Sequence, residues 1–543
     1  MTGAAFLSGK ERNMEFFIPQ DAPRIPHKKH WQFCVGSGHA LLALRTDWTR
    51  QLKFIHDTLG IERVRFHGIF NDDMCTRTDL SQMFPAPGAE SFTEENFRAC
   101  GLAYDNVLAA GMRPFVELSF IPKALSTSAS RGAFFYRPCV DPPAEAEAWT
   151  GYIRRFVRFL IHRYGAEEVR SWYFEVWNEP DLKVVFFSQD RDAYFQLYEA
   201  TARAIKSVDP GLRVGGPATS GSKWIVSFLD YCRAHEVPVN FITTHQYAGD
   251  PIGGVENQGE GTEEERRSGG ESWPERIQKM GARLAAVKEK SFLSGYRAIN
   301  PDQTEISDLP NDTFRKNAAV ARQQAGALPL YYTEWNCNAG FASVTNDTRK
   351  VAAYDMKAAL DVAEHVDGSS IWCFSDIFEE FHPFVQEFHG GFGLLSQSGI
   401  PKPVYYAMKL LADAPDTRLD LGPYATDGEI GIAAFSDRRE THVLLFRQKM
   451  KNLDLPKEEA VVRIEMPEKP SRVTLKRIDE EHGNPLKLWE AMGKPDYLNR
   501  AEVEELKARS AVEGESWPFR WADGVLTLRA ELGVNDVYGF VIR

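Results

Sequence analysis

The sequence predicts an α/β fold with a smaller β-rich part behind it, and three observations carry this prediction. At 543 residues the chain is longer than one ordinary hydrophobic core supports. From about residue 31 to 409, short β-rich runs alternate with longer helical patterns, which is typical of βα units around a parallel sheet. Beyond residue 410 the helical patterns give way to short β-like runs with turns between them. We therefore expect two domains, 31–409 and 410–543.

Eight β-rich runs fall in the first domain, each followed by enough chain for a helix. They are WQFCVG near 31, RVRFHG near 63, RPFVELSF near 113, WYFEVWNEP near 172, LRVGGPA near 212, FITTHQY near 241, LPLYYTEWN near 328 and SIWCFSD near 370. Eight such units close most naturally into a (β/α)8 TIM barrel. Its active site is expected where the strands end and the βα loops begin.

Helical patterns with recognisable ends lie between these runs. The segment from Trp149 to Tyr164 carries apolar residues at spacings of three and four. Thr93 is expected to cap an earlier helix, which Gly111 and Pro114 then close. Two polar insertions, 248–275 and 296–313, interrupt the rhythm and are either lids or solvated loops.

The second domain is expected to be an antiparallel β-sandwich. Its β-like runs are IGIAAFSD, HVLLFRQ, AVVRIEM, RVTLKRID and VYGFVIR. The stretch RAEVEELKARSAV predicts one helix within it. MEFFIP, within residues 1–30, is expected to add a strand to the same sheets.

Composition and charge narrow the class of partner. The formal net charge of −12 argues against nucleic acid or an acidic bilayer, because both require concentrated Lys and Arg. No apolar run approaches the roughly 20 residues of a membrane span. A small neutral substrate fits this composition, and the sequence leaves the oligomeric state open.

Cysteine usage and the N-terminal residues bear on compartment and cofactors. The seven cysteines are scattered and form no CxxC pair, so we expect reduced thiols, no structural metal and no cofactor. The first residues lack the apolar core of a secretory signal, which predicts a cytoplasmic protein.

A phosphate-binding loop at Gly36 and Gly38 is excluded because the later glycine and lysine that such loops require are missing.

The segment SWYFEVWNEPDL is the most informative for chemistry. An apolar strand ends here in Asn178, Glu179 and Pro180, and polar residues at a strand tip indicate a site. Hydrolysis of a glycoside needs a carboxylic acid that holds its proton at neutral pH, and burial near aromatic rings such as Trp177 favours this state.

LPLYYTEWN repeats this arrangement. Its apolar strand ends with Glu334, which Trp335 and Asn336 follow. Two acids on the tips of different strands can face each other across a barrel mouth, and a retaining mechanism needs them roughly 5 to 5.5 Å apart. Either acid alone is as readily an ion-paired or capping carboxylate, but the pair favours catalysis. Glu117 and Glu175 lie before the tips and are expected to be supporting hydrogen-bond partners.

Together these motifs resemble glycoside hydrolase family 39, a set of β-xylosidases and α-L-iduronidases among the (β/α)8 retaining enzymes. The resemblance rests on WNEP and TEW, and on RFHGIFNDDM, RPFVELSFIP, VGGPATS, ITTHQY, YYTEWN, FSDIFEE and FHGGFGLL along the whole barrel. The C-terminal stretch RIDEEHGNPLKLWEAMG resembles the β-xylosidase branch.

The resemblance implies roles for individual residues. Glu179 becomes the acid/base and Glu334 the nucleophile, while Asn178 hydrogen-bonds the sugar 2-hydroxyl. The remaining residues implied for sugar binding are His67, His245, Tyr247, Trp372, Glu379 and Glu380.

These implied sugar ligands have structural alternatives. The two histidines are otherwise core residues bonded to backbone, Trp372 a core aromatic rather than a stacking platform, and Glu379 with Glu380 a solvated pair. Trp335 stays open between the same two roles. His39 and Asp376 are weaker candidates.

The expected function is therefore a retaining β-xylosidase acting on short β-1,4-xylo-oligosaccharides and aryl β-xylosides. An α-L-iduronidase or a β-glucosidase on the same scaffold is the alternative enzyme. An iduronidase needs cationic residues in the pocket, and the motifs offer only Arg63 and Arg65, which are expected to face structure. A noncatalytic carbohydrate-binding protein is the alternative from another class, although both acids are present.

Overall fold

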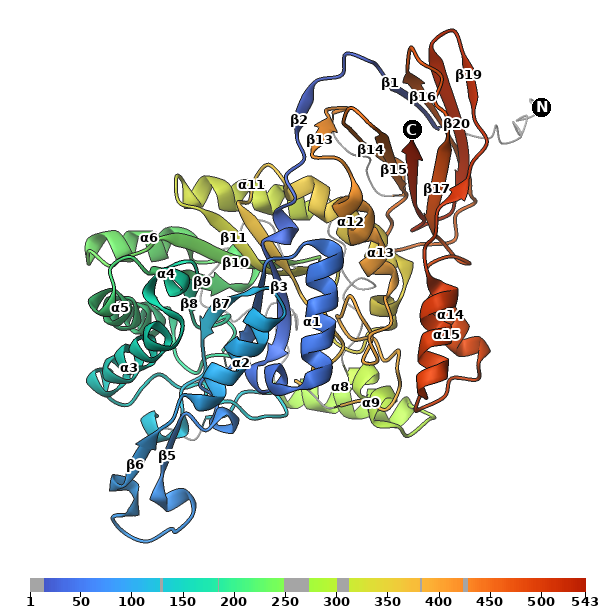
Figure 1. Ribbon diagram of the computed structural model, residues 1–543. Helices are drawn as coiled ribbons and strands as arrows, with labels where there is room; N and C mark the ends of the chain where they lie inside the picture. Colours follow the sequence, from blue (N-terminus) through green and yellow to red (C-terminus); the bar gives the residue numbers. More distant parts are fainter. Residues whose placement is uncertain are drawn as a thin grey trace, which may run out of the picture.

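The computed structural model describes residues 14–126, 130–183, 185–248, 273–299, 312–380, 383–422 and 428–543. Figure 1 shows a barrel surrounded by helices, with the C-terminal strands beside it at the upper right. No helix in the described part of the chain has both the length and the apolar character needed to cross a membrane.

Eight parallel strands close into a barrel in the order β10-β11-β12-β3-β4-β7-β8-β9. They are β3 (Cys34–His39), β4 (Arg63–His67), β7 (Arg113–Leu118), β8 (Tyr173–Val176), β9 (Arg213–Thr219), β10 (Phe241–Tyr247), β11 (Leu330–Asn336) and β12 (Gly368–Ile371). Each strand overlaps one of the eight β-rich runs, so the predicted (β/α)8 barrel is confirmed.

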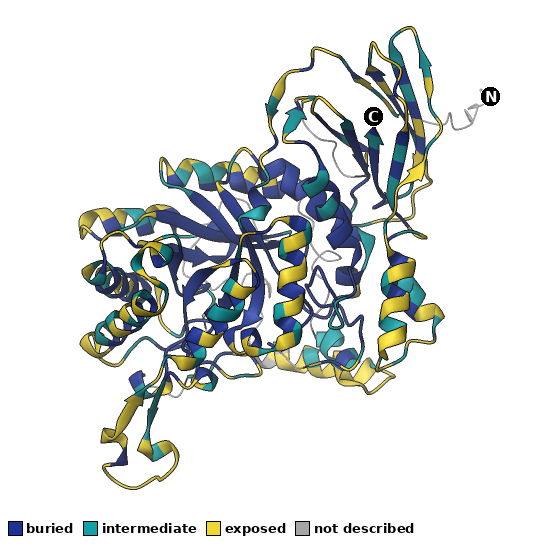
Figure 2. Ribbon diagram, viewed as in Figure 1, coloured by how far each residue is buried: buried dark blue, intermediate teal, exposed yellow. Residues whose placement is uncertain are grey.

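Helices cover the outside of the barrel because each presents one apolar face to the strands. They are α1 (Thr46–Leu59), α2 (Arg98–Ala109), α3 (Ala146–Tyr164), α4 (Ala166–Arg170), α5 (Arg191–Val208), α6 (Ile225–Ala234), α11 (Thr313–Ala325), α12 (Arg349–Val362) and α13 (Pro403–Asp413). In α3, for example, Trp149, Ile153 and Phe156 are fully buried. Figure 2 shows the contrast between these buried strands and the exposed outer faces of the helices.

The expected cap at Thr93 is wrong. Thr93 pairs with Asp79 in a two-stranded hairpin of β5 (Arg77–Asp79) and β6 (Thr93–Glu95), and α2 begins only at Arg98. This hairpin projects from the barrel at the lower left of Figure 1. A β-branched residue with an exposed side chain suits such a ladder as well as it suits a cap.

Most of the two polar insertions lies outside the described residues. Between β10 and β11 the structure describes α8 (Trp273–Ala286) and α9 (Phe292–Ile299). Leu293 of α9 is buried in a cluster with Tyr247 and Trp372, two of the predicted site residues. Helix α9 therefore packs at the carboxyl ends of the barrel strands.

The C-terminal part consists of two sheets. One has the order β1-β16-β20-β19 and the other β18-β17-β21-β15-β14-β13-β2. Their strands are β1 (Met14–Ile18), β2 (Arg24–Pro26), β13 (Thr417–Leu419), β14 (Gly431–Ser436), β15 (Thr441–Phe446), β16 (Glu458–Glu465), β17 (Val473–Ile478), β18 (Glu515–Ser516), β19 (Arg520–Ala522), β20 (Val525–Leu532) and β21 (Val537–Ile542). Buried residues of both sheets form one cluster, as in a sandwich.

Each of the two N-terminal strands belongs to one of these sheets, β1 to the four-stranded sheet and β2 to the seven-stranded sheet. Strand β2 pairs antiparallel with β13, whereas β1 pairs parallel with β16, so the sandwich is not antiparallel throughout. Two helices, α14 (Pro485–Ala491) and α15 (Arg500–Ser510), lie in the connection between β17 and β18.

The barrel and the seven-stranded sheet share a hydrophobic core. Phe435, Leu444 and Val537 from the sheet belong to the same buried cluster as the barrel residues. Helix α13 crosses residue 410 and contacts α1, α12 and β17.

Candidate active site

Glu179 and Glu334 meet at the carboxyl ends of the barrel strands. One carboxylate oxygen of each and a ring nitrogen of His245 all lie within 4.8 Å of one another. The two glutamates are 7% and 4% exposed, so water screens their charges little. The structure thus brings together two acids that stand far apart in the sequence.

The backbone around Glu179 is held in an uncommon conformation. Both Trp177 (φ 71°) and Glu179 (φ 37°) lie in the left-handed region, which residues with a Cβ seldom adopt. The Trp177 indole donates to the Phe186 carbonyl at 2.8 Å, and the Glu179 amide donates to the Ala218 carbonyl at 2.8 Å. These bonds help to offset the strain.

Arg65 bonds Glu334 and the neighbour of Glu179, Asn178, and was not predicted as a site residue. Its guanidinium donates to Glu175 at 2.5 Å, to Glu334 at 2.8 Å and to the Asn178 oxygen at 2.7 Å. It also contacts Glu117 at 2.8 Å. Arg65 is fully buried and bonded to protein groups, as expected of a residue that faces structure, but its direct bond to Glu334 was not predicted.

Glu334 has a donor on each carboxylate oxygen. Arg65 donates to Oε1, and the Tyr247 hydroxyl donates to Oε2 at 2.9 Å. The adjacent strands β10 and β11 place His245 in register with Glu334. These contacts stabilise the charge of Glu334 and fix its orientation.

His67 stands between Glu117, Glu334 and Glu380. Its Nδ1 lies 2.7 Å from Glu117, and its Nε2 lies 3.6 Å from Glu334 and 3.7 Å from Glu380. Burial acts to lower the pKa of His67, but the charge of Glu117 and its hydrogen bond outweigh it and the pKa rises to about 9. His67 is therefore a cation at neutral pH.

Glu380 is buried beside this histidine. Burial raises the pKa of Glu380 to about 8, with His67 opposing and neighbouring carboxylates adding to the rise. Its Oε1 is buried and accepts no hydrogen bond within the described residues. A neutral carboxyl with an open oxygen suits a sugar hydroxyl.

Asn178 and His245 each leave one buried nitrogen without a partner in the described part of the chain, Nδ2 and Nε2 respectively. The His245 Nδ1 lies 2.9 Å from Glu179 Oε1. Burial lowers the pKa of His245, so its ring is neutral at pH 7. Because buried polar groups normally find partners, these atoms indicate where a ligand binds.

Trp372 packs beside the two acids' neighbour His67, whereas Glu379 pairs with Arg45 instead. The Trp372 ring packs on His67 with 4.7 Å between centroids. The Glu379 carboxylate forms an ion pair with Arg45, and its side chain is 32% exposed. The contacts of the described residues thus bring Glu380, but not Glu379, to the two acids. The Trp335 indole donates to Ser369 inside the barrel wall, which makes it a core aromatic.

The two weaker candidates differ in position. His39 is in register with His67, stacks on Tyr136 and lies 3.3 Å from Asp73. Asp376 is fully buried and bonds Lys402 at 3.0 Å.

Acidic side chains outnumber cationic ones in this cluster. Five carboxylates from Glu117, Glu175, Glu179, Glu334 and Glu380 meet two cations, Arg65 and His67, among the described residues. In a buried site such an excess of negative charge favours the protonated form of some carboxyls. Glu179, His245 and Glu334 are close enough to hold an ion, but Arg65 and the Tyr247 hydroxyl already donate to the two carboxylate oxygens of Glu334.

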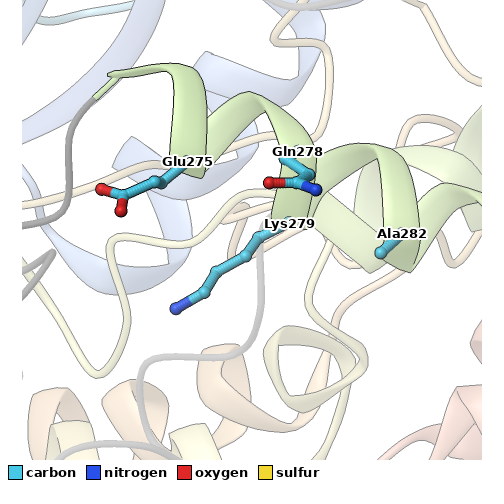
Figure 3. A pocket seen from close by; sticks show the side chains of 4 residues that line it. All are labelled: Glu275, Gln278, Lys279 and Ala282. Carbon is cyan, nitrogen blue, oxygen red and sulfur yellow. The ribbon is translucent and has the colours of Figure 1, made fainter.

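A hollow of about 360 Å³ lies along α8, and the residues that line it, shown in Figure 3, are Glu275, Gln278, Lys279 and Ala282. Its described lining includes none of the predicted site residues.

Comparison with known proteins identifies the family. The model of glycosyl hydrolases family 39 matches residues 14–269 and 303–525. The chain is 37% identical to a β-xylosidase of Caldicellulosiruptor saccharolyticus over 90% of both chains. It is 33% identical to a β-xylosidase of Geobacillus stearothermophilus, covering 95% of this chain and 92% of that one.

A solved structure agrees. The crystal structure of the GH39 enzyme from Xanthomonas axonopodis pv. citri superposes with a TM-score of 0.77 at 27% identity, over 99% of this chain and 98% of the other. The eight strands, the paired glutamates and the matched residues lead to one conclusion. This chain belongs to family 39 of the glycosyl hydrolases.

Proposed function

We propose that the protein is a retaining β-xylosidase that releases xylose from the nonreducing end of short β-1,4-xylo-oligosaccharides and aryl β-xylosides. The observation that carries the proposal is the approach of the Glu179 and Glu334 carboxylates to within 4.8 Å. Retaining enzymes hold the two carboxyls roughly 5–5.5 Å apart, whereas inverting enzymes need about 6.5–9.5 Å to admit a water.

In the first step Glu334 acts as the nucleophile. Its carboxylate attacks the anomeric carbon, the glycosidic C–O bond breaks, and Glu179 gives its proton to the departing oxygen. Arg65 and Tyr247 hold the attacking carboxylate in place. The product is a covalent xylosyl ester on Glu334.

In the second step Glu179, now ionised, takes a proton from water. The water oxygen attacks the anomeric carbon, the ester bond to Glu334 breaks, and xylose leaves with its original β configuration. Glu179 is then protonated again. Neutral His245 lies 2.9 Å from the Glu179 carboxyl. It keeps this contact when Glu179 loses its proton in the first step and regains it in the second.

The buried atoms around the acids are proposed to bind the sugar. Asn178 Nδ2 is the donor for the 2-hydroxyl, and His245 Nε2 and Glu380 Oε1 are available to other hydroxyls. His67 and Tyr247 line the same cluster, and Trp372 offers a ring face for the C–H side of the sugar. Glu379 keeps a role only if it exchanges Arg45 for substrate.

A xyloside is favoured over an iduronide. An iduronidase has to bind a carboxylate, and Arg65 is fully buried and occupied by three glutamates and Asn178. Two relatives that match most of the chain are β-xylosidases. A β-glucosidase stays the alternative, because the contacts described set no limit on a hydroxymethyl group at C5.

The proposed compartment is the cytoplasm. All seven cysteines are free and six are buried, which suits a reducing environment.

A substrate panel tests the proposal. The aryl β-xyloside should be cleaved faster than the aryl β-glucoside, α-arabinoside and α-iduronide, and proton NMR should detect β-xylose first. First release of α-xylose would exclude retention, and preference for another sugar would change the substrate. If the wild type gives no more turnover than Glu334→Ala on every substrate, the result favours the noncatalytic alternative, a carbohydrate-binding protein.

A further inference from the structure

The chain turns sharply after Glu179. The Leu182 amide donates to the Glu179 carbonyl at 2.9 Å, which closes a turn over residues 179–182. A left-handed φ at a residue such as Glu179 costs on the order of 1–3 kcal/mol and persists only where neighbouring contacts enforce it. The contacts that enforce it decide where the acid points.

Asp181 is one of the residues of this turn, and its side chain is only 2% exposed. Its Oδ1 accepts from the Ser220 amide at 2.9 Å. Its Oδ2 accepts from the Ser220 hydroxyl at 2.6 Å and from Lys223 Nζ at 3.0 Å. All three donors belong to the segment that follows β9, so one carboxylate ties the loop after β8 to the loop after β9.

The end of β9, directly before this segment, holds the backbone of Glu179 and the strand of His245. The Glu179 amide donates to Ala218, and the Thr244 hydroxyl donates to the Thr219 carbonyl at 3.0 Å. Thr244 precedes His245, which contacts the Glu179 carboxylate. Asp181 therefore fastens Glu179 to the structural unit that carries its histidine partner.

We propose that Asp181, through Ser220 and Lys223, is a positioning residue that sets the Glu179 carboxyl at the glycosidic oxygen. Asp181 acts through the backbone of Glu179 and its role does not require contact with substrate. The inference rests on the proposed function, in which Glu179 is the acid/base.

Dependence on the leaving group separates positioning from general structural support. Cleavage of xylobiose releases the second xylose, whose 4-oxygen is a poor leaving group as an alkoxide and therefore needs a well-placed acid, whereas 2,4-dinitrophenolate departs without protonation. Loss of general acid catalysis costs about 10²–10⁴-fold, so Asp181→Ala should lower kcat/KM for xylobiose at least about tenfold. The value for 2,4-dinitrophenyl β-xyloside should change less than about threefold, because kcat/KM reports steps up to departure of the leaving group.

Asp209→Asn is the matched control. Asp209 accepts from the Gly211 amide and from Arg170, both at 2.8 Å, but it precedes β9 at the opposite end of the barrel. This variant should show no difference between the two substrates. Ser220→Ala, which removes one hydroxyl contact, gives a second and milder test and should show the selective loss in reduced form.

Equal losses on both substrates, or no loss on either, would overturn the inference. Failure of the proposed function is recognised separately. In that case the wild type cleaves neither xyloside, or Glu179→Gln shows no selective loss on xylobiose.

Discussion

Arg65 Nη1 donates to Glu334 Oε1 at 2.8 Å inside the barrel, although 269 residues separate the two in the sequence. Arg65 is 0% exposed and also contacts Glu117 and Glu175. One side chain therefore neutralises part of a buried acidic cluster and orients the proposed nucleophile.

Arg65→Lys should be severely impaired, because a single ammonium group cannot reproduce the planar contacts to several carboxylates. We expect kcat/KM to fall by about 10²-fold or more, as on removal of a preorganised electrostatic contact. Buried carboxylate oxygens that lose their donor also lower the free energy of unfolding, by about 1–3 kcal/mol for each unsatisfied group. Kinetics and urea unfolding measure the two effects. Arg63→Lys is the control, since Arg63 pairs with exposed Glu62. Equal behaviour of the two variants would contradict the prediction.

Glu334→Ala should lose activity by several orders of magnitude and respond to azide. Azide enters the space that the carboxylate vacates and attacks the anomeric carbon directly, so the product should be α-xylosyl azide. Glu179→Ala keeps the nucleophile, and azide then intercepts the covalent intermediate to give β-xylosyl azide. NMR of the two products distinguishes the roles, and the same anomer from both variants would reverse or remove the assignment.

Glu380 should set an alkaline limit on activity. Burial raises its pKa to about 8, so the carboxyl donates a hydrogen bond below that pH and repels other carboxylates above it. We expect kcat/KM to decline as pH rises through about 8. Glu380→Gln keeps a neutral donor and should move this limb to higher pH. An unchanged limb in the variant would show that another group sets it.

His67 should contribute stability that depends on pH. Burial lowers its pKa, the Glu117 charge outweighs burial, and the net pKa rises from 6.5 to about 9. A raised pKa in the folded state stabilises fully below about pH 6.5, and the contribution is lost as pH rises to about 9. The difference in free energy of unfolding between wild type and His67→Gln should therefore shrink between pH 6 and pH 9. Urea midpoints at both pH values measure it, and a constant difference would refute the assignment.

Lys402 should stabilise the folded state, because it is the cation between two buried carboxylates next to the site. It is fully buried and contacts Asp347 at 2.6 Å, Asp376 at 3.0 Å and the Gly391 carbonyl at 2.8 Å. Lys402→Met leaves two carboxylates buried without their cation and should cost about 3–5 kcal/mol. Adding Asp347→Asn and Asp376→Asn should recover much of this loss. Thermal unfolding of both variants tests it, and an additive loss in the triple variant would argue against charge as the cause.

The strands were predictable because hydrophobic runs bounded by Gly, Pro and polar tips depend on local sequence. The cap at Thr93 failed because a hairpin over 77–95 competes for the same residues, and pairing with Asp79 is a tertiary choice. The approach of Glu179 to Glu334 followed from barrel closure, since strand ends converge whatever their separation in sequence.

Arg65 was missed although a signal was present. Side chains alternate along a strand, so Arg65 and His67 share a face of β4, and His67 was already predicted to line the site. Glu117 and Glu175 were correctly expected to support the site through hydrogen bonds. The position of Glu379 could not be predicted from the sequence. Whether its carboxylate pairs with Arg45 or joins the acidic residues at the barrel mouth depends on the conformation of the loop.

The hydrophobic cluster shared by the barrel and the seven-stranded sheet has a consequence for engineering the chain. Cutting after α13, at residue 413, would leave the apolar surfaces of α12 and α13 facing water where strands β15, β17 and β21 had covered them. A shortened barrel would aggregate instead of standing alone, and swapping the C-terminal part between relatives would require exchanging these contact surfaces with it.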